Sequence, residues 1–205
     1  MVSNPLALVL QRCLAALHTP LSSSQLAITA ALLGLYAAWA LPWGLASGVL
    51  LRRWRPSRPG PLLCRAVALL WMPAFGEELI FRVAPLPRPG EGAALGAALG
   101  WATLALAAFV AYHPLAARLW YPAGRELFHD PRFLALCGAL GLVCTLSYWS
   151  SGSLLAPVLV HWLVVLVWLD PLGGTTQLSG NDRERRTARC AAGAGTPPGR
   201  GGDAA

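Results

Sequence analysis

Long apolar segments, joined by short arginine-containing connections, run through most of this chain and leave few folds open to it. Five of them are candidates to cross a bilayer: residues 26–51, 65–86, 92–112 or somewhat beyond, 133–150 and 154–169. A helix needs about 20 mostly apolar residues to do so. Only 12% of the 205 residues are charged, against about a quarter in soluble domains. The sequence therefore predicts an all-α, polytopic integral membrane protein, a helical bundle of about five spans.

The two ends of the chain differ from this middle region. Residues 1–25 are apolar but interrupted by Arg12 and His18, which favours an interfacial helix. They lack the basic start of a signal peptide. Residues 26–170 form the expected membrane-embedded domain. Residues 171–205 are rich in Gly, Thr and Arg without periodicity, which is typical of a disordered, basic tail.

The distribution of arginine predicts the orientation. All 16 basic residues are arginines, and groups of five, three and five follow the first, third and fifth apolar segments. Since positive residues concentrate on the cytoplasmic side, the N-terminus is expected outside and the C-terminus in the cytoplasm, in a bacterial plasma (inner) membrane. The arginines do not follow one amphipathic face, so orientation explains the net charge of +7 better than nucleic acid does. The expected partner is the lipid bilayer, and no nucleic acid is expected.

Ionisable residues within the spans are few, and a charge inside a membrane is costly enough to mark a candidate site. They are Glu77, Glu78, Arg82, His113 and His161. Glu78 and Arg82 are four residues apart on one helix and are expected to pair. Glu77 points about 100° away, with no cation near it in sequence. If the third segment continues past Pro114, Glu77 and both histidines lie at similar depths and could meet, as reactive groups or as an inert polar cluster that holds three helices together.

These residues resemble the CAAX prenyl protease and bacteriocin-processing (CPBP, or Abi) family of intramembrane proteases. The family's first motif, Glu-Glu-x-x-x-Arg, is matched by residues 77–82, and its second, Phe-x-x-x-His, by Phe109 to His113. The third motif, His-x-x-x-Asn or Asp, is matched at His161 but has Val165 in place of the polar residue. The resemblance covers residues 62–168.

The resemblance implies an intramembrane endopeptidase in which Glu77 activates water for attack on a peptide bond. His113 and His161 would bind or polarise the water and stabilise the developing oxyanion, and Glu78, Arg82 and Phe109 would support them. The implied substrate is a peptide or membrane protein, and a prenylated CAAX terminus is one option. The catalytic trio of one Glu and two His could also hold a divalent metal such as zinc with an open position. The lack of an HExxH pair favours catalysis that requires no metal.

Two functions of other classes also fit the sequence. Val165 permits a non-catalytic membrane adaptor or assembly factor on the same fold, and two adjacent glutamates could form the proton relay of a transporter. The lack of evident inverted repeats argues against a transporter. Side chains gathered around one cavity would favour the protease, and dispersed ones the adaptor. Val165 is expected to border that cavity, in which case Tyr112, Ser147 or a water could supply the hydrogen-bond donor that valine cannot.

Overall fold

The computed structural model describes residues 4–52 and 59–178, and this part of the chain contains helices and no β-strand. The expected all-α fold is confirmed. Between α2 and α5 the chain forms one composite helix, residues 59–83, in which α-helical and π-helical stretches alternate. The separate helices are α1 (Pro5–His18), α2 (Ser23–Ala46), α5 (Leu95–Leu119), α6 (Pro131–Ser151) and α7 (Leu155–Leu169). The composite helix comprises α3 (Pro59–Leu69), Leu70–Phe75, α4 (Gly76–Glu78) and Leu79–Val83, and short 3₁₀ turns at Pro122–Gly124 and Leu127–His129 join α5 to α6.

Three of the five predicted spans are helices long and apolar enough to cross a membrane. They are α2, α5 and α6, with 24, 25 and 21 residues and mean hydropathies of 1.6, 1.7 and 1.6. The other two predicted spans are the composite helix and α7, which has 15 residues. The predicted boundaries need adjustment, because α2 ends at Ala46 and α5 continues through Pro114 to Leu119.

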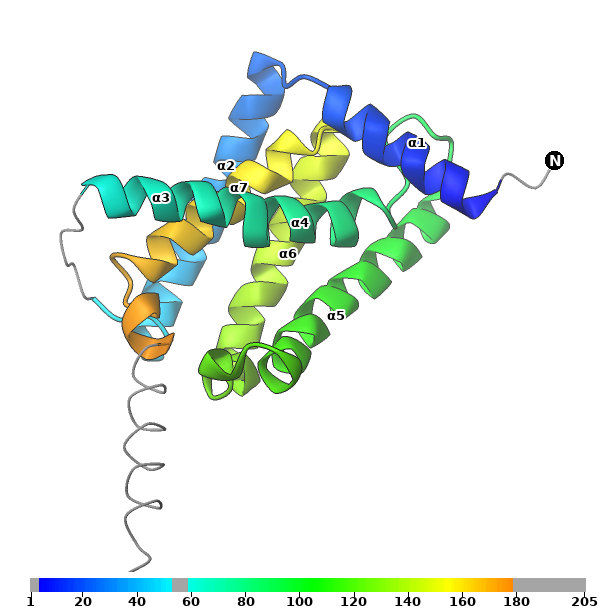
Figure 1. Cartoon of the computed structure of the whole chain (residues 1–205). Helices are drawn as coiled ribbons and strands as arrows, with labels where there is room; N and C mark the ends of the chain where they lie inside the picture. Colours follow the sequence, from blue (N-terminus) through cyan, green and yellow to red (C-terminus); the bar gives the residue numbers. More distant parts are fainter. Residues whose placement is uncertain (1–3, 53–58, 179–205) are drawn as a thin grey trace, which may run out of the picture.

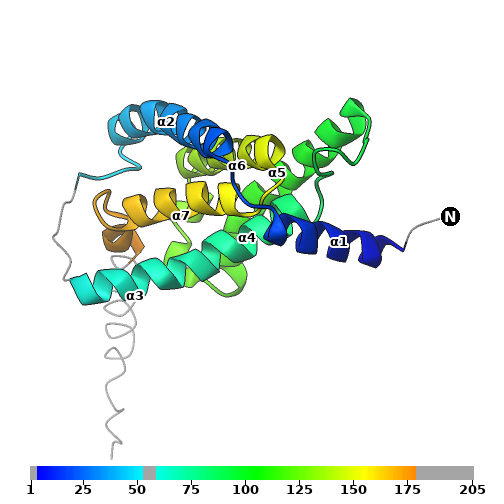
Figure 2. The ribbon, with the colours of Figure 1, turned by 90° about the horizontal axis from the view of Figure 1, so that it is seen from above.

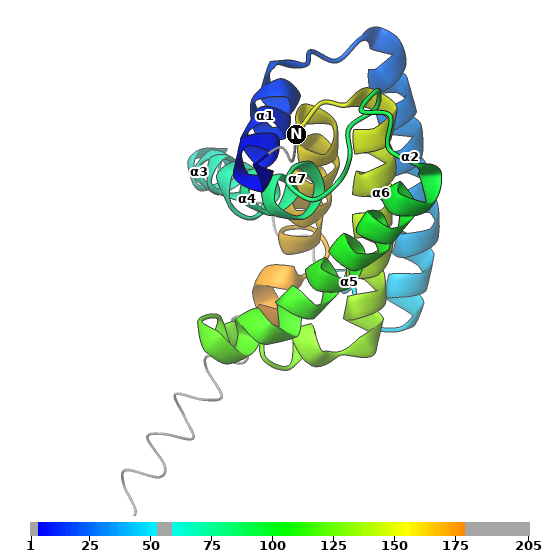
Figure 3. The same ribbon diagram turned by 90° about the vertical axis from the view of Figure 1, so that its right-hand side faces the viewer.

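Helices α2, α5 and α7 run toward the lower end of Figure 1 and α6 runs away from it, so the connections after α2 and α5 and the end of α7 lie together at that end. Helix α6 is central and contacts α2, α5 and α7 (Figures 1 and 3). The composite helix crosses α6 steeply in Figure 1 and runs alongside α7 when seen from above (Figure 2). This arrangement brings residues of α4, α5 and α7 toward one another.

The composite helix is interrupted just before its acidic residues. Met72 has an extended backbone, with φ of −140° and ψ of 120°. The following residue is Pro73, whose ring disfavours helical geometry in the residue before it. The second predicted span, residues 65–86, is therefore not one regular helix, and Glu77 and Glu78 lie in the first turns after the break.

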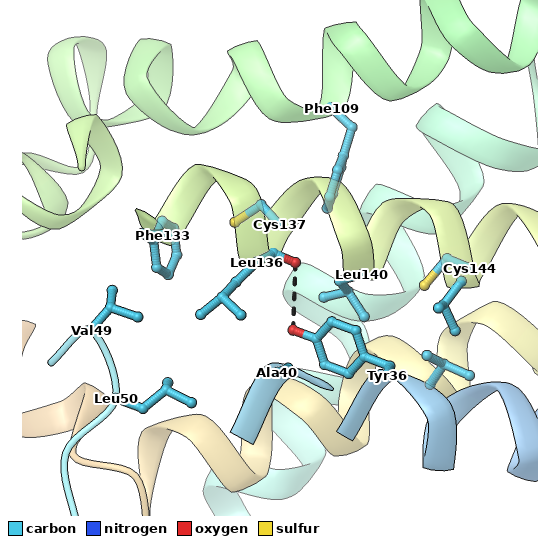
Figure 4. Close-up of a cluster of buried hydrophobic side chains, with 12 residues drawn as sticks. Tyr36, Ala40, Val49, Leu50, Phe109, Phe133, Leu136, Cys137, Leu140 and Cys144 are labelled. Atoms are coloured by element: carbon cyan, nitrogen blue, oxygen red, sulfur yellow. Dashed lines mark hydrogen bonds between the residues drawn. The ribbon is translucent and has the colours of Figure 1, made fainter. Parts of the chain in front are cut away.

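The largest group of buried apolar residues lies mainly between α2 and α6. Its centre is drawn in Figure 4, where Tyr36 of α2 faces Leu136, Leu140 and Cys144 of α6. The Tyr36 hydroxyl donates to the Leu136 carbonyl over 3.5 Å. That distance is at the long limit of hydrogen bonding, so packing, more than this bond, holds the two helices together.

Helix α1 is tied to the upper end of the bundle by polar contacts. Arg12 forms an ion pair with Glu91 at 2.6 Å, and the backbone N–H of Leu154 donates to the Ala16 carbonyl at 3.1 Å. Burial alone would raise the pKa of the Glu91 carboxyl, but hydrogen bonding and charge from Arg12 and Arg88 outweigh it and lower that pKa. The remaining face of α1 exposes four leucines, at positions 6, 10, 14 and 17. The interfacial position of this helix stays a prediction.

The described part of the chain extends beyond the predicted start of the tail. Residues 171–178 pack on the connection after α2, where the Leu51 N–H donates to the Leu172 carbonyl at 3.0 Å and Gln177 Nε2 donates to the Val49 carbonyl at 3.1 Å. These eight residues belong to the predicted tail, whose disorder stays a prediction. Residues 179–205, the rest of the predicted tail, lie outside the described part.

Candidate active site

Glu78 and Arg82 form a buried ion pair inside the bundle. Arg82 Nε lies 3.2 Å from Glu78 Oε2, and the two side chains are 1% and 0% exposed. The pairing predicted from their spacing is confirmed. Removal of either charge would leave the other buried without a partner, so the pair is costly to break.

His161 of α7 contacts both glutamates, and its nearer partner is Glu78. Its Nδ1 lies 2.6 Å from Glu78 Oε1, whereas its Nε2 lies 3.8 Å from Glu77 Oε2. Since the carboxylate of an ion pair accepts hydrogen bonds, we infer that Nδ1 carries the hydrogen and donates it. The Nε2 atom of His161 is thereby directed toward Glu77. Sequence reasoning did not find the contact with Glu78, because 83 residues separate the two positions.

His113 of α5 is held by its own helix. Its Nδ1 donates to the Phe109 carbonyl at 2.9 Å, because a carbonyl oxygen can only accept. The ring also meets Phe128 and Phe133 edge-on, with centroid distances of 5.5 and 5.9 Å. These contacts fix the ring and direct Nε2 away from the helix backbone.

The Phe109 ring lies at the centre of the site. Its centroid is 5.0 Å from that of His113 and 5.9 Å from that of His161, and both contacts are edge-on. The Arg82 guanidinium carbon lies 4.1 Å above the same ring, a cation–π contact that stabilises a desolvated cation. Phe109 was expected to support the site, but neither its contact with Arg82 nor its position between the histidines could be read from the motif.

Glu77, His113 and His161 line one cavity of about 700 Å³. They come from α4, α5 and α7, and the rest of the wall is mostly aliphatic and aromatic side chains of α2, α5, α6 and α7. Val165 also lines this cavity, as predicted. Glu78 and Arg82 do not, so the two adjacent glutamates face different surroundings. Glu77, His113 and His161 are therefore gathered around one cavity and are not dispersed.

A metal ion at this site would have to be bound by Glu77, His113 and His161. Their chemistry suits zinc, and hydrogen bonds from Nδ1 to Glu78 and to a carbonyl resemble those that orient zinc-ligating histidines. Within residues 4–52 and 59–178, however, no three His, Cys, Asp or Glu side chains are grouped closely enough to hold a metal. As placed, the three residues surround a cavity and share no common ligand position.

Gly141 of α6 allows Arg82 and Phe109 to pack against the helix backbone. A Cβ at this position would lie 2.8 Å from Arg82 Nη2, 3.1 Å from Phe109 Cδ1 and 2.6 Å from a methyl carbon of Leu106. We expect Gly141→Ala to destabilise the fold by about 1–3 kcal/mol, the usual cost of overpacking, and thermal unfolding in detergent measures it. Gly138→Ala, one turn earlier, is the control, since its nearest neighbour would be 3.7 Å away. Equal melting temperatures for the two variants would contradict the close packing.

Comparison with known proteins places the same region in a family. A family model described as type II CAAX prenyl endopeptidase Rce1-like matches residues 59–167, which is more than half of the chain. The matched range begins with the composite helix and ends in α7, so it contains all three reactive candidates. No curated protein and no solved structure matches the chain.

Proposed function

This chain belongs to the Rce1-like family of type II CAAX prenyl endopeptidases, and from that premise we propose that it hydrolyses a peptide bond within the membrane with water activated by Glu77. One observation carries the proposal: Glu77, His113 and His161, from three helices, line a single cavity. The family match supports the class of reaction, and the geometry supports the choice of residues.

The proposed reaction begins with a water held between Glu77 and His161. The 3.8 Å between their facing atoms is too long for a direct hydrogen bond and suits a bridging water. Glu77 takes one proton from this water while the water oxygen bonds to the carbonyl carbon and the C=O π electrons move to the carbonyl oxygen. When the tetrahedral intermediate collapses, the C–N bond breaks and the proton on Glu77 passes to the departing nitrogen.

The cavity favours an apolar substrate segment. Its wall includes Leu33 and Ala37 of α2, Leu140 of α6 and Val164 of α7. We propose a peptide or membrane-protein substrate whose apolar portion occupies this space. A prenylated C-terminus is the substrate that the family's name favours.

We further propose that the reaction requires no metal. Glu77 can act as the base directly, and His161 is already oriented by Glu78. Cleavage by purified protein is expected to survive treatment with a strong chelator. Loss of activity that returns on addition of zinc would instead assign a metal to these three residues.

Comparative membrane proteomics tests the function without the need to choose a substrate in advance. Cells that express the wild type are compared with cells that express Glu77→Gln at the same level. A membrane peptide that shortens only with the wild type would identify the reaction and its substrate together. If the two membrane proteomes are identical while the variant still supports the cellular function, the non-catalytic adaptor is the better explanation.

Val165 is the observation that favours the adaptor, since valine lines the cavity where the family motif has an amide or acid. Loss of one oxyanion donor costs about 10²–10³ in rate in a well-studied protease.

We expect a slow protease, because an inactive chain would gain stability by losing Glu77 and both histidines. Val165→Asn should therefore raise the rate of peptide cleavage without a change in expression, and a fixed rate would contradict this.

The arginine distribution gives a prediction of topology. We propose that the lower end of Figure 1 faces the cytoplasm of a bacterial cell and that the N-terminus lies outside. Reporters fused after Arg58 and after Gly180, positions outside the described residues, should report cytoplasm, and one at Gly90 the opposite face. Signals from Arg58 and Gly90 on the same side would contradict the assignment of spans.

A further inference from the structure

The two histidines leave the proposed reaction without an evident donor for the oxyanion. In each ring Nδ1 already donates, to Glu78 from His161 and to a backbone carbonyl from His113. A neutral imidazole with its hydrogen on Nδ1 offers Nε2 only as an acceptor. Glu77 is an acceptor while it is ionised, and in the proposed reaction the proton that it then takes from the water is delivered to the departing nitrogen. The oxyanion needs a hydrogen-bond donor, and none of these three groups supplies one in these states.

Few groups along the cavity could fill this role. Val165 has no hydrogen to donate. Ser147 does not line the cavity, and its hydroxyl donates to the Cys144 carbonyl at 2.9 Å. Tyr36 lines it, but its hydroxyl is directed to the Leu136 carbonyl of the α2–α6 core.

Tyr112 meets the requirements. It lines the same cavity as Glu77 and precedes His113 on α5. Its ring lies 5.8 Å from the His113 ring and 5.5 Å from that of Phe81, which fixes its position. Tyr112 comes from α5 and Glu77 from α4, so the two side chains reach this cavity from different helices. Within the described residues the Tyr112 hydroxyl has no hydrogen-bond partner, so its hydrogen is available to a ligand.

We propose that the Tyr112 hydroxyl donates the hydrogen bond that stabilises the oxyanion, in place of the polar side chain that the family motif has at position 165. This inference rests on the proposed endopeptidase function. No proton is transferred to the substrate in this step, because the phenol shares its hydrogen with the negative oxygen while that charge exists. A donor in the same cavity as Glu77 stabilises the oxyanion most when the carbonyl becomes tetrahedral, so it acts on kcat more than on substrate binding.

The test compares steady-state cleavage of one membrane peptide by the wild type and by matched variants. Tyr112→Phe keeps the ring and removes the hydroxyl, and we expect kcat to fall about 10²–10³-fold with KM within about twofold. Tyr148→Phe is the control, since Tyr148 is a buried tyrosine of α6 outside the cavity, and its kcat should equal that of the wild type. Val165→Asn should raise kcat by a larger factor in the Tyr112→Phe protein than in the wild type, because the new amide would replace the missing hydroxyl. A variant that lost activity through poor folding would not show this coupling.

The outcomes separate this inference from the function on which it rests. If Glu77→Gln is inactive while Tyr112→Phe keeps kcat within about threefold of the wild type, the hydroxyl is not the donor and a protonated histidine is the better candidate. A change in KM without a change in kcat in Tyr112→Phe would likewise show that the hydroxyl is not the donor. If Glu77→Gln cleaves as fast as the wild type, the proposed function fails first. If the Tyr112→Phe protein cannot be extracted in folded form, fluorotyrosine can be placed at position 112 instead. It retains the shape of tyrosine and is a stronger hydrogen-bond donor, so it should alter kcat. An unaltered kcat would overturn the proposal.

Discussion

Glu77→Gln is expected to lower kcat for peptide cleavage by about 10²–10⁴-fold, the usual contribution of a general base, while the protein still folds. Glutamine has nearly the shape of glutamate but cannot take a proton from water at neutral pH. Glu77 makes no close ion pair in the described structure, with His161 Nε2 at 3.8 Å, so loss of its charge should cost little stability. The measurement is kcat on a membrane peptide, with thermal unfolding in detergent on the same preparations.

The matched control for this prediction is Glu126→Gln, which changes the same chemical group at an exposed position between α5 and α6. It should cleave as the wild type does. Undiminished cleavage by Glu77→Gln would remove the proposed mechanism. A variant that loses both activity and folded yield would show instead that Glu77 has a structural role.

Glu78→Gln is expected to have the larger effect on stability. It leaves Arg82, which is 1% exposed, without its carboxylate, and breaking a buried pair in this way costs about 3–5 kcal/mol. The cost should be high here, because Arg82 Nη1 and Nη2 have no hydrogen-bond partner of their own in the described chain. The contact with the Phe109 ring offsets only part of it. Folded yield after detergent extraction and the melting temperature are the measurements.

A second substitution distinguishes the loss of a partner from the loss of the glutamate itself. In Glu78→Gln combined with Arg82→Met no buried cation remains, and replacement of a whole buried pair by apolar groups is often nearly neutral. The double variant should therefore melt at a higher temperature than Glu78→Gln alone. If Glu78→Gln and Glu77→Gln melt at the same temperature, the pair contributes nothing to stability.

Much of this architecture could be predicted because it depends on local patterns. The apolar segments located all five long helical regions, and helical spacing paired Glu78 with Arg82. The prediction that His113 reaches the same layer as Glu77 required α5 to continue past Pro114, and it does. The break at Met72 could have been predicted as well, because the signal is the residue that precedes Pro73.

The contacts of the site depend on packing between distant segments, which spacing does not report. No sequence-local rule indicates that His161 donates to Glu78 instead of Glu77, because the choice depends on how α7 lies against the composite helix. The same is true of the Arg82 contact with Phe109 and of the space left by Gly141. The sequence places Tyr112 at nearly the same depth in the membrane as His113, its neighbour on α5. It does not indicate that the Tyr112 hydroxyl has no hydrogen-bond partner within the described residues.

Glu77 and Glu78 are adjacent in sequence, yet one borders the cavity and the other contacts only the protein interior. In the proposed protease, substrate selectivity and the buried ion pair are consequently under separate control. Exchanges among cavity residues outside the buried core, such as Ala37, Leu41 and Leu163, change the shape available to a bound chain and leave the charges around Arg82 untouched. Evolution or protein engineering could therefore adapt this bundle to a new membrane substrate through substitutions in the apolar wall of the cavity, while the buried pair of Glu78 and Arg82 is retained.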